Sequence, residues 1–263
     1  MAKRSTKLHE RTQRKAQAFS CGFADRLVRP LVLALVVATV FSSCAEKKTA
    51  VKDFDAASDE QAALDEKVKK GIKPVPDAEV AVIETADFGN IVIELHPNIA
   101  PKMVERFKKL IKEGFYNGTT FHRVNADAGL IQGGDPLSKD SDPENDGQGD
   151  SPYPNVPGEM SDVFFERGTV GAARKSADEP FSGGPGLTET QARDTANCQF
   201  FITLKRSPEF DRKYTVFGRV IQGIEAAQLI MGHPVVEETE RPSEKIAIKS
   251  ITLQPRAKFV SGS

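Results

Sequence analysis

The stretch Phe121–Asp135, which reads FHRVNADAGLIQGGD, decides the fold. Its two ends, within residues 119–124 and 130–133, are apolar and β-branched enough to predict two short strands. Arg123 and Gln132 place a full positive charge and an amide in a segment that otherwise looks like protein core. Either the arginine is an ordinary surface residue, or it faces a ligand.

The rest of the chain predicts more strands and two helices around this stretch. Residues 80–85 and 89–95 are β-rich runs joined by a short turn, which is typical of a hairpin. Apolar residues at helical spacing predict a helix within residues 97–114, and a second helix is expected over 224–231. Further strands are expected at residues 168–173, 199–203, 215–220 and 246–253. Many short strands with glycine-rich connections predict a mainly β domain, a closed antiparallel barrel with helical caps.

Two long polar segments interrupt this pattern. Residues 136–157 and 175–196 are rich in Asp, Gly, Pro and Ser, which favours surface loops. Four acidic or small residues of the first loop echo a calcium loop only superficially, because position twelve of such a loop would be Tyr153. We expect a solvated acidic loop without bound calcium.

The N-terminus predicts export. Residues 1–43 carry a net charge of +6 followed by the apolar run 31–41, which is too short to span a bilayer and suits a signal peptide. Ser42 and Ser43 before Cys44 resemble a bacterial lipobox, in which Cys44 receives the lipid. An ordinary signal peptide with an incidental cysteine is the alternative. Residues 44–77, rich in Lys, Asp, Glu and Ala, are expected to form a flexible tether.

Charge and cysteine content exclude several kinds of function. Beyond residue 43 the chain carries a net charge of −7, so no basic stripe is left for nucleic acid. If Cys21 leaves with the signal and Cys44 is acylated, Cys198 is the remaining thiol, and its neighbours favour a buried core position. The four histidines are scattered without metal-ligand spacing. We therefore expect no metal and no cofactor.

Four ordered motifs give the chain a specific resemblance. They are FYNGTTFHRV at residues 115–124, IQGGD at 131–135, NCQFFI at 197–202 and VFGRV at 216–220. This order is similar to the cyclophilin family of peptidyl-prolyl cis-trans isomerases, here in a bacterial lipoprotein form. The resemblance covers residues 78–255 and leaves 256–263 as a C-terminal tail. It implies an eight-stranded antiparallel barrel capped by two α-helices, with an active groove on the outside.

The chemistry of such an isomerase explains the arginine. Conjugation resists rotation of a peptide bond by about 18–20 kcal/mol, and X-Pro bonds interconvert over tens to hundreds of seconds. A catalyst needs no nucleophile; it must favour the twisted bond with a donor in an apolar groove. A thousand-fold gain requires about 4 kcal/mol, and one well-placed donor supplies about 3–4 kcal/mol. The stabilisation that one arginine can supply is therefore close to the free energy that such a rate gain requires.

The resemblance assigns roles to particular residues of this chain. It makes Arg123 the catalytic donor and Gln132 the residue that positions it and contacts the substrate backbone. The residues that it implies for substrate binding are Phe201, Leu130, Phe210, Tyr214, Gln199, Asn197 and Ala173. Phe200, beside the aromatic floor residue Phe201, is expected to be core.

The sequence departs from the family in the apolar part of the groove. One extra residue separates Arg123 from Gln132, and Gly129-Leu130 replaces the family's Phe-Met pair. Glu209 stands at the tryptophan position, and the chain has no Trp. The polar half of the machinery is intact and the apolar half is reduced, so the expected activity is measurable with lowered efficiency.

Two functions from different classes remain open. One is a lipid-anchored isomerase that acts on extended, Pro-containing segments of exported proteins. The other is a binding module that holds such segments with little or no turnover. The resemblance and the N-terminus together imply a monomer in the bacterial cell envelope, on the periplasmic or outer-membrane side, attached through Cys44.

Overall fold

The computed structural model describes residues 58–177, 186–236 and 239–260 of the 263-residue chain. The contacts divide the chain into Met1–Lys48 and Thr49–Ser263, and every described residue belongs to the second unit. The predicted signal peptide and Cys44 lie outside the described residues.

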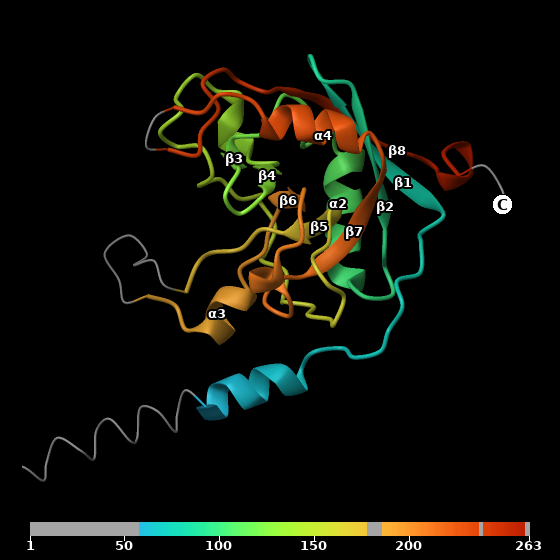
Figure 1. The fold of residues 1–263 in the computed structure, drawn as a ribbon, viewed down its shortest axis with the longest axis vertical. Helices are drawn as coiled ribbons and strands as arrows, with labels where there is room; N and C mark the ends of the chain where they lie inside the picture. Colours follow the sequence, from blue (N-terminus) through green and yellow to red (C-terminus); the bar gives the residue numbers. More distant parts are fainter. Residues whose placement is uncertain (1–57, 178–185, 237–238, 261–263) are drawn as a thin grey trace, which may run out of the picture. The chain divides into compact units, whose positions relative to one another are not determined.

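Eight antiparallel strands form a single sheet in the described unit (Figure 1). Their order across the sheet is β3-β4-β6-β5-β7-β2-β1-β8, so the sheet begins and ends with β3 and β8. The prediction of a mainly β domain is confirmed. The strands are β1 (Glu79–Thr85), β2 (Asn90–Leu95), β3 (Arg123–Asn125), β4 (Leu130–Gly133), β5 (Thr169–Ala172), β6 (Phe200–Thr203), β7 (Val216–Gln222) and β8 (Ile248–Pro255).

The predicted closed barrel is not what the structure shows, because the sheet is curled but open. No strand ladder joins the edge strands β3 and β8 in the described residues; an isolated bridge pairs Thr120 with Ala247 just before each strand starts. Backbone hydrogen bonds from Gly118 to Ile248 and from Ile248 to Thr119, both between 2.8 and 2.9 Å, flank this bridge. The predicted strand over 119–124 is therefore mostly an extended segment, and only its end pairs with β4.

Helix α2 (Pro101–Lys112) packs one face against the sheet. Proline suits its first turn, because the missing N–H would have no intrahelical partner there. Gly114 follows with a φ of +67°, the left-handed conformation that glycine adopts without strain. The buried face was predicted from the helical spacing and is confirmed; it consists of Met103, Val104, Phe107, Leu110 and Ile111.

Three further α-helical segments occur in the described residues, and the first spans residues 58–66. Helix α4 (Ile224–Met231) has the predicted bounds, and its Ala227 and Ile230 are fully buried. The short helix α3 (Glu189–Arg193) lies within a segment that was predicted to be loop only. Thr188 and Gln191 form a capping box at its start, in which each side chain accepts a bond from the other residue's backbone N–H.

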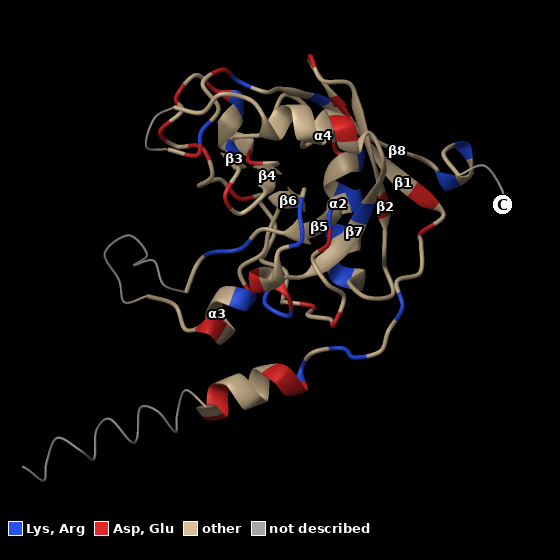
Figure 2. Ribbon diagram, in the orientation of Figure 1, with Lys and Arg blue, Asp and Glu red and all other residues tan. Residues whose placement is uncertain are grey.

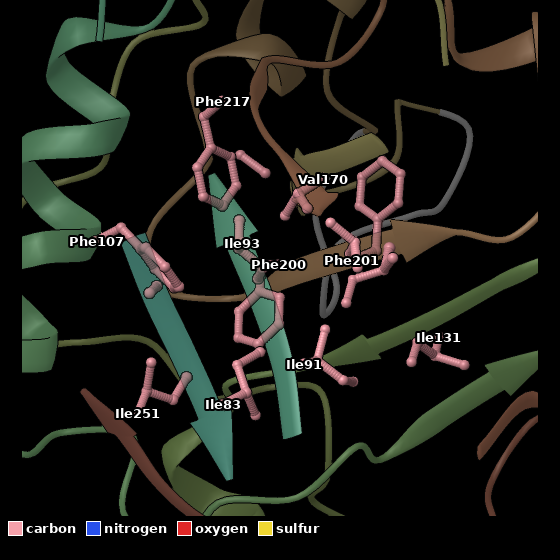
Figure 3. Close-up of a cluster of buried hydrophobic side chains, with 14 of the residues drawn as sticks. Ile83, Ile91, Ile93, Phe107, Ile131, Val170, Phe200, Phe201, Phe217 and Ile251 are labelled. Atoms are coloured by element: carbon pink, nitrogen blue, oxygen red, sulfur yellow. The ribbon is translucent and has the colours of Figure 1, made fainter. Parts of the chain in front are cut away.

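The main core lies between α2 and the sheet (Figure 3). Phe107 of α2 packs edge-on against Phe200 of β6 and Phe217 of β7, with ring centroids 5.5 and 5.2 Å apart. All three side chains are fully buried, so the prediction that Phe200 is core is confirmed. Side chains alternate along a strand, so Phe201 projects to the opposite face of β6. The core thereby fixes which face of the sheet is left for a site.

The described end of the predicted tether is hydrogen-bonded to the domain. Lys69 pairs with Ser161 in an isolated parallel bridge, and its ammonium group donates to the carbonyl of Ile99 at 2.8 Å. Further along, Asn98 accepts from the backbone of Val75 and donates to the carbonyl of Lys73. The composition that predicted a free tether did not reveal these partners, because they lie on distant parts of the chain.

Acidic and basic residues are interspersed over the described chain (Figure 2). Both signs occur in the loops drawn beside β3 and β4. Among the described residues, no helix is both long enough and apolar enough to span a bilayer.

Candidate active site

A row of facing residues across four strands builds the site. Arg123 of β3 lies opposite Gln132 of β4, Gln132 lies opposite Phe201 of β6, and Phe201 lies opposite Gly171 of β5. Residues that face each other in neighbouring strands project to the same side of the sheet. The antiparallel register therefore brings a cation, an amide and an aromatic ring together on the sheet face opposite Phe200.

A chain of hydrogen bonds fixes the polar half of this row. Arg123 Nη1 donates to Gln132 Oε1 at 3.1 Å, and Gln132 Nε2 donates to Gln199 Oε1 at 2.9 Å. Gln199 Nε2 in turn donates to the carbonyls of Gly147 and Gly149, both at 2.9 Å. Each amide is oriented by its neighbour, so the Gln132 oxygen is held toward the arginine.

Phe201 is the centre of an aromatic cluster. Its ring stacks on Phe165 at 5.5 Å between centroids with 13° between the ring planes. Phe210 and Tyr214 meet it edge-on, each at 5.5 Å, and Tyr214 also carries the Arg174 guanidinium over its ring at 4.5 Å. The predicted apolar residues Phe201, Phe210 and Tyr214 are thus brought together.

No pattern in the sequence indicated Phe165, which supplies a large part of this cluster. It is fully buried, and Phe201 is 3% exposed. Phe210 and Tyr214 are half-buried, so they form the part of the cluster that is open to solvent. Phe165 does not replace the large Phe that Gly129-Leu130 lacks. It is fully buried and stacks against Phe201, so it is not open to a substrate.

Gly129 shows why the sequence departs from the family between Arg123 and Gln132. It has a φ of +67° in the turn between β3 and β4, and an added Cβ would lie 2.4 Å from Lys205 Cγ. The turn is closed at its other end by Asn125, whose Oδ1 accepts from the backbone of Ala128 at 2.6 Å. A larger residue at position 129 would be strained in this backbone conformation and would collide with Lys205.

Three predicted substrate-binding residues, Leu130, Ala173 and Asn197, lie outside both the polar chain of hydrogen bonds and the aromatic cluster. Leu130, two residues from Gln132 on the same strand face, is 3% exposed. Ala173 is half-buried and donates its backbone N–H to Gln199 at 3.0 Å. Asn197 is 4% exposed, and its Oδ1 accepts from the backbone and the hydroxyl of Ser151 at 2.8 and 2.6 Å. The structure thus does not bring the Asn197 side chain to Arg123; it holds a loop in place.

Glu240 is a site residue that sequence reasoning missed. Its carboxylate accepts from Arg123 Nε and from Asn125 Nδ2, and its carbonyl accepts from the backbone of Val124 at 2.7 Å. It lies 117 positions after Arg123 in an acidic segment, where no local pattern distinguishes it from its neighbours. Only the tertiary structure reveals the contact.

Two buried groups near the site, His122 and Cys198, are uncharged at neutral pH. Burial lowers the pKa of His122 to about 4, against the opposing effect of the Asp135 charge. Burial raises the pKa of the Cys198 thiol to about 12, and Cys198 is fully buried as predicted. A thiol with such a pKa is not a nucleophile at neutral pH. In the described part of the chain, no three His, Cys, Asp or Glu residues are grouped so that they could hold a metal ion.

Sequence comparison defines the class of the protein. Residues 80–253 match the family model for cyclophilin type peptidyl-prolyl cis-trans isomerases. This match covers more than half of the chain, so the chain belongs to this family. It is a cyclophilin-type peptidyl-prolyl cis-trans isomerase, as the motifs suggested.

Individual relatives agree with this assignment. A probable peptidyl-prolyl cis-trans isomerase of Brucella suis is 39% identical over 158 residues, which cover 59% of this chain and 72% of the relative. Peptidyl-prolyl cis-trans isomerase-like 3 of Gallus gallus is 36% identical over 181 residues, covering 66% of this chain and 96% of that protein.

Solved structures show the same fold. A cyclophilin type isomerase of Cryptosporidium parvum superposes with a TM-score of 0.55 at 28% identity and covers 67% of this chain and 97% of that chain. A second crystal structure of it, in the presence of the dipeptide Ala-Pro, gives a TM-score of 0.53 at 27% identity, covering 66% of this chain and 98% of that chain.

Proposed function

We propose that this protein accelerates rotation of X-Pro bonds at the row formed by Arg123, Gln132 and Phe201. The observation that carries the proposal is the register that places the three side chains on one sheet face. The arginine supplies the N–H donors, and the Phe201 cluster supplies the apolar surface against which a proline ring can pack.

The chemistry needs one charged donor and little else. A guanidinium that donates to the prolyl nitrogen, or to the carbonyl before it, withdraws the lone pair from conjugation and favours the twisted bond. An arginine side chain supplies a permanent positive charge for this purpose. Gln132 keeps the guanidinium plane in place through the bond from Nη1. The isomerase therefore requires no change of protonation state in its cycle.

The substrates that we propose are extended, Pro-containing segments of exported proteins. The Ala-Pro dipeptide with the Cryptosporidium relative supports this substrate class. The basic and apolar N-terminus followed by Cys44 supports a lipid-anchored protein of the bacterial cell envelope. Replacement of Cys44 by Ala is expected to release the protein from the membrane fraction; an unchanged membrane fraction would contradict the anchor.

The experiment that tests the catalytic proposal compares wild type with Arg123→Ala. We expect the second-order rate constant for an Ala-Pro peptide, in a protease-coupled assay, to fall by about 100-fold to 1000-fold, because one donor in a dry site is worth about 3–4 kcal/mol. Arg219→Ala, which removes an exposed arginine from β7, is the matched control and should keep wild-type activity.

Equal rates for wild type and Arg123→Ala would contradict the proposal. If both equal the uncatalysed rate while the wild type still binds the peptide, the protein is a proline-peptide binding module instead.

A further inference from the structure

The segment after α4 reaches across to β3 and places one carboxylate on the catalytic arginine. Glu240 accepts from Arg123 Nε through one carboxylate oxygen and from Asn125 Nδ2 through the other. Arg123 and Asn125 lie two residues apart on β3, so both side chains are on the same face of the strand. Glu240 therefore lies directly over the edge strand that carries the arginine.

The guanidinium of Arg123 is held on two sides. Glu240 accepts from Nε, and Gln132 accepts from Nη1 at 3.1 Å. The group is planar, so two acceptors at different nitrogens fix both its position and the orientation of its plane. Among the described residues, none accepts a hydrogen bond from Nη2. The two contacts thus leave both N–H groups of Nη2 and the second N–H of Nη1 to donate to a substrate.

We propose that Glu240 is a positioning residue for the isomerase reaction, which holds Arg123 in the orientation that offers its remaining N–H groups to the prolyl amide. This inference rests on the proposed function of Arg123. It adds a second positioning residue beside Gln132, supplied by a segment that is far from the site in sequence.

Backbone hydrogen bonds hold the segment around Glu240 in place, independently of the Glu240 side chain. The carbonyl of Glu240 accepts from the backbone of Val124 at 2.7 Å, and Val236 donates its backbone N–H to the carbonyl of Arg241 at 2.8 Å. Arg241 also forms an ion pair with Glu144 at 2.9 Å. Substitution of the Glu240 side chain should therefore leave the segment where it is.

Because Arg123 and Glu240 are both partly exposed, a loss of catalysis on substitution can be told apart from a loss of folding stability. The side chains of Arg123 and Glu240 are 43% and 42% exposed. Ion pairs this exposed contribute little to folding stability, because water screens the charges. Loss of Glu240 should accordingly change the turnover of the enzyme and leave its melting temperature nearly constant.

The test uses Glu240→Gln and Glu240→Ala in the full chain, with Glu244→Gln as the matched control. Glu244 is an exposed carboxylate of the same segment and has no role in the site. We expect Glu240→Ala to lower kcat/KM for an Ala-Pro peptide about tenfold, mainly through kcat. Glu240→Gln keeps an acceptor oxygen and should retain activity within about threefold of wild type, and Glu244→Gln should match wild type.

A spectroscopic measurement keeps this inference distinguishable from the proposed function. In an NMR spectrum of the wild type, the Arg123 Nε–H proton should give a resonance that exchanges slowly with water. We expect Glu240→Ala to abolish this resonance and Glu240→Gln to retain it. If wild type and Arg123→Ala are equally inactive, the proposed function fails, whereas this resonance still reports on the contact.

Three results would overturn the inference. An increase in activity in both Glu240 variants would show that the carboxylate competes with substrate for the arginine. Wild-type activity in Glu240→Ala, or a resonance that is unaffected by the substitution, would show that Glu240 does not position Arg123.

Discussion

Arg123 and His122 are neighbours in sequence with opposite environments. Arg123 is half-buried and engages Glu240 and Gln132, whereas His122 is 6% exposed on the other side of the chain. This alternation answers the question that the sequence raised about a charge inside a core-like segment. The extended chain here places its charged residue on the site face and its uncharged imidazole inside the protein.

The environment of His122 predicts a pH dependence of stability. Burial lowers its pKa from 6.5 to about 4, so the unfolded chain binds this proton more readily than the folded protein. The stabilising effect of the neutral form is complete above about pH 6.5 and is lost progressively as the pH falls through 4. It amounts to about 3 kcal/mol at most.

Replacement of His122 by Gln removes this titration. We expect the free energy of unfolding, from urea denaturation at pH 7 and pH 4, to fall less between the two values in His122→Gln than in wild type. The difference isolates His122 from the carboxylates, which titrate in both proteins. An equal fall in both would contradict a depressed pKa.

At the scale of the elements, the sheet register is what builds the site. The bounds of β4 and α4 could be predicted from sequence because apolar residues and glycines mark them locally. The start of β3 could not, since residues 119–121 are as strand-like as Arg123 but pair with the segment before β8 through single bonds. Which partner an extended segment finds depends on the tertiary structure.

The site residues divide in the same way. The motif resemblance indicated Arg123, Gln132 and Phe201, and the structure places them together. It could not indicate Phe165 or Glu240, because contacts between distant segments leave no periodic pattern in the chain. It assigned Asn197 to substrate, whereas the structure directs its side chain to Ser151.

A substitution at Gly171 of β5 tests whether the site needs the Phe201 ring in its present position, because Gly171 lies against that ring. An added Cβ would lie 2.5 Å from Phe201 Cζ and 2.8 Å from Phe165 Cε1. We expect Gly171→Ala to displace the Phe201 ring, to lower kcat/KM about tenfold, and to cost about 1–3 kcal/mol of stability through overpacking.

The control for this prediction restores the space. Gly171→Ala combined with Phe165→Leu should recover part of the lost activity, because the smaller side chain lets the Phe201 ring return. If Gly171→Ala alone kept wild-type activity and melting temperature, the site would not depend on the position of the Phe201 ring, and the prediction would be wrong.

At the scale of the whole described domain, two segments that are distant in sequence contact the residues of the site. The loop that contains Gly147 and Gly149 holds Gln199, and the segment after α4 holds Arg123 through Glu240. Arg241 and Glu144 pair these two segments with each other. Contacts from both segments thus surround the row of Arg123, Gln132 and Phe201 on the open sheet.

The central claim is that this row acts as one unit, with Gln132 acting through Arg123. The most direct test is a double-mutant cycle of Arg123→Ala and Gln132→Ala, with kcat/KM for an Ala-Pro peptide as the measured quantity. We expect about a tenfold fall for Gln132→Ala alone, a much larger fall for Arg123→Ala, and a double variant no slower than Arg123→Ala. If the double variant instead lost the product of the two single effects, the two residues would act independently and the account would be wrong.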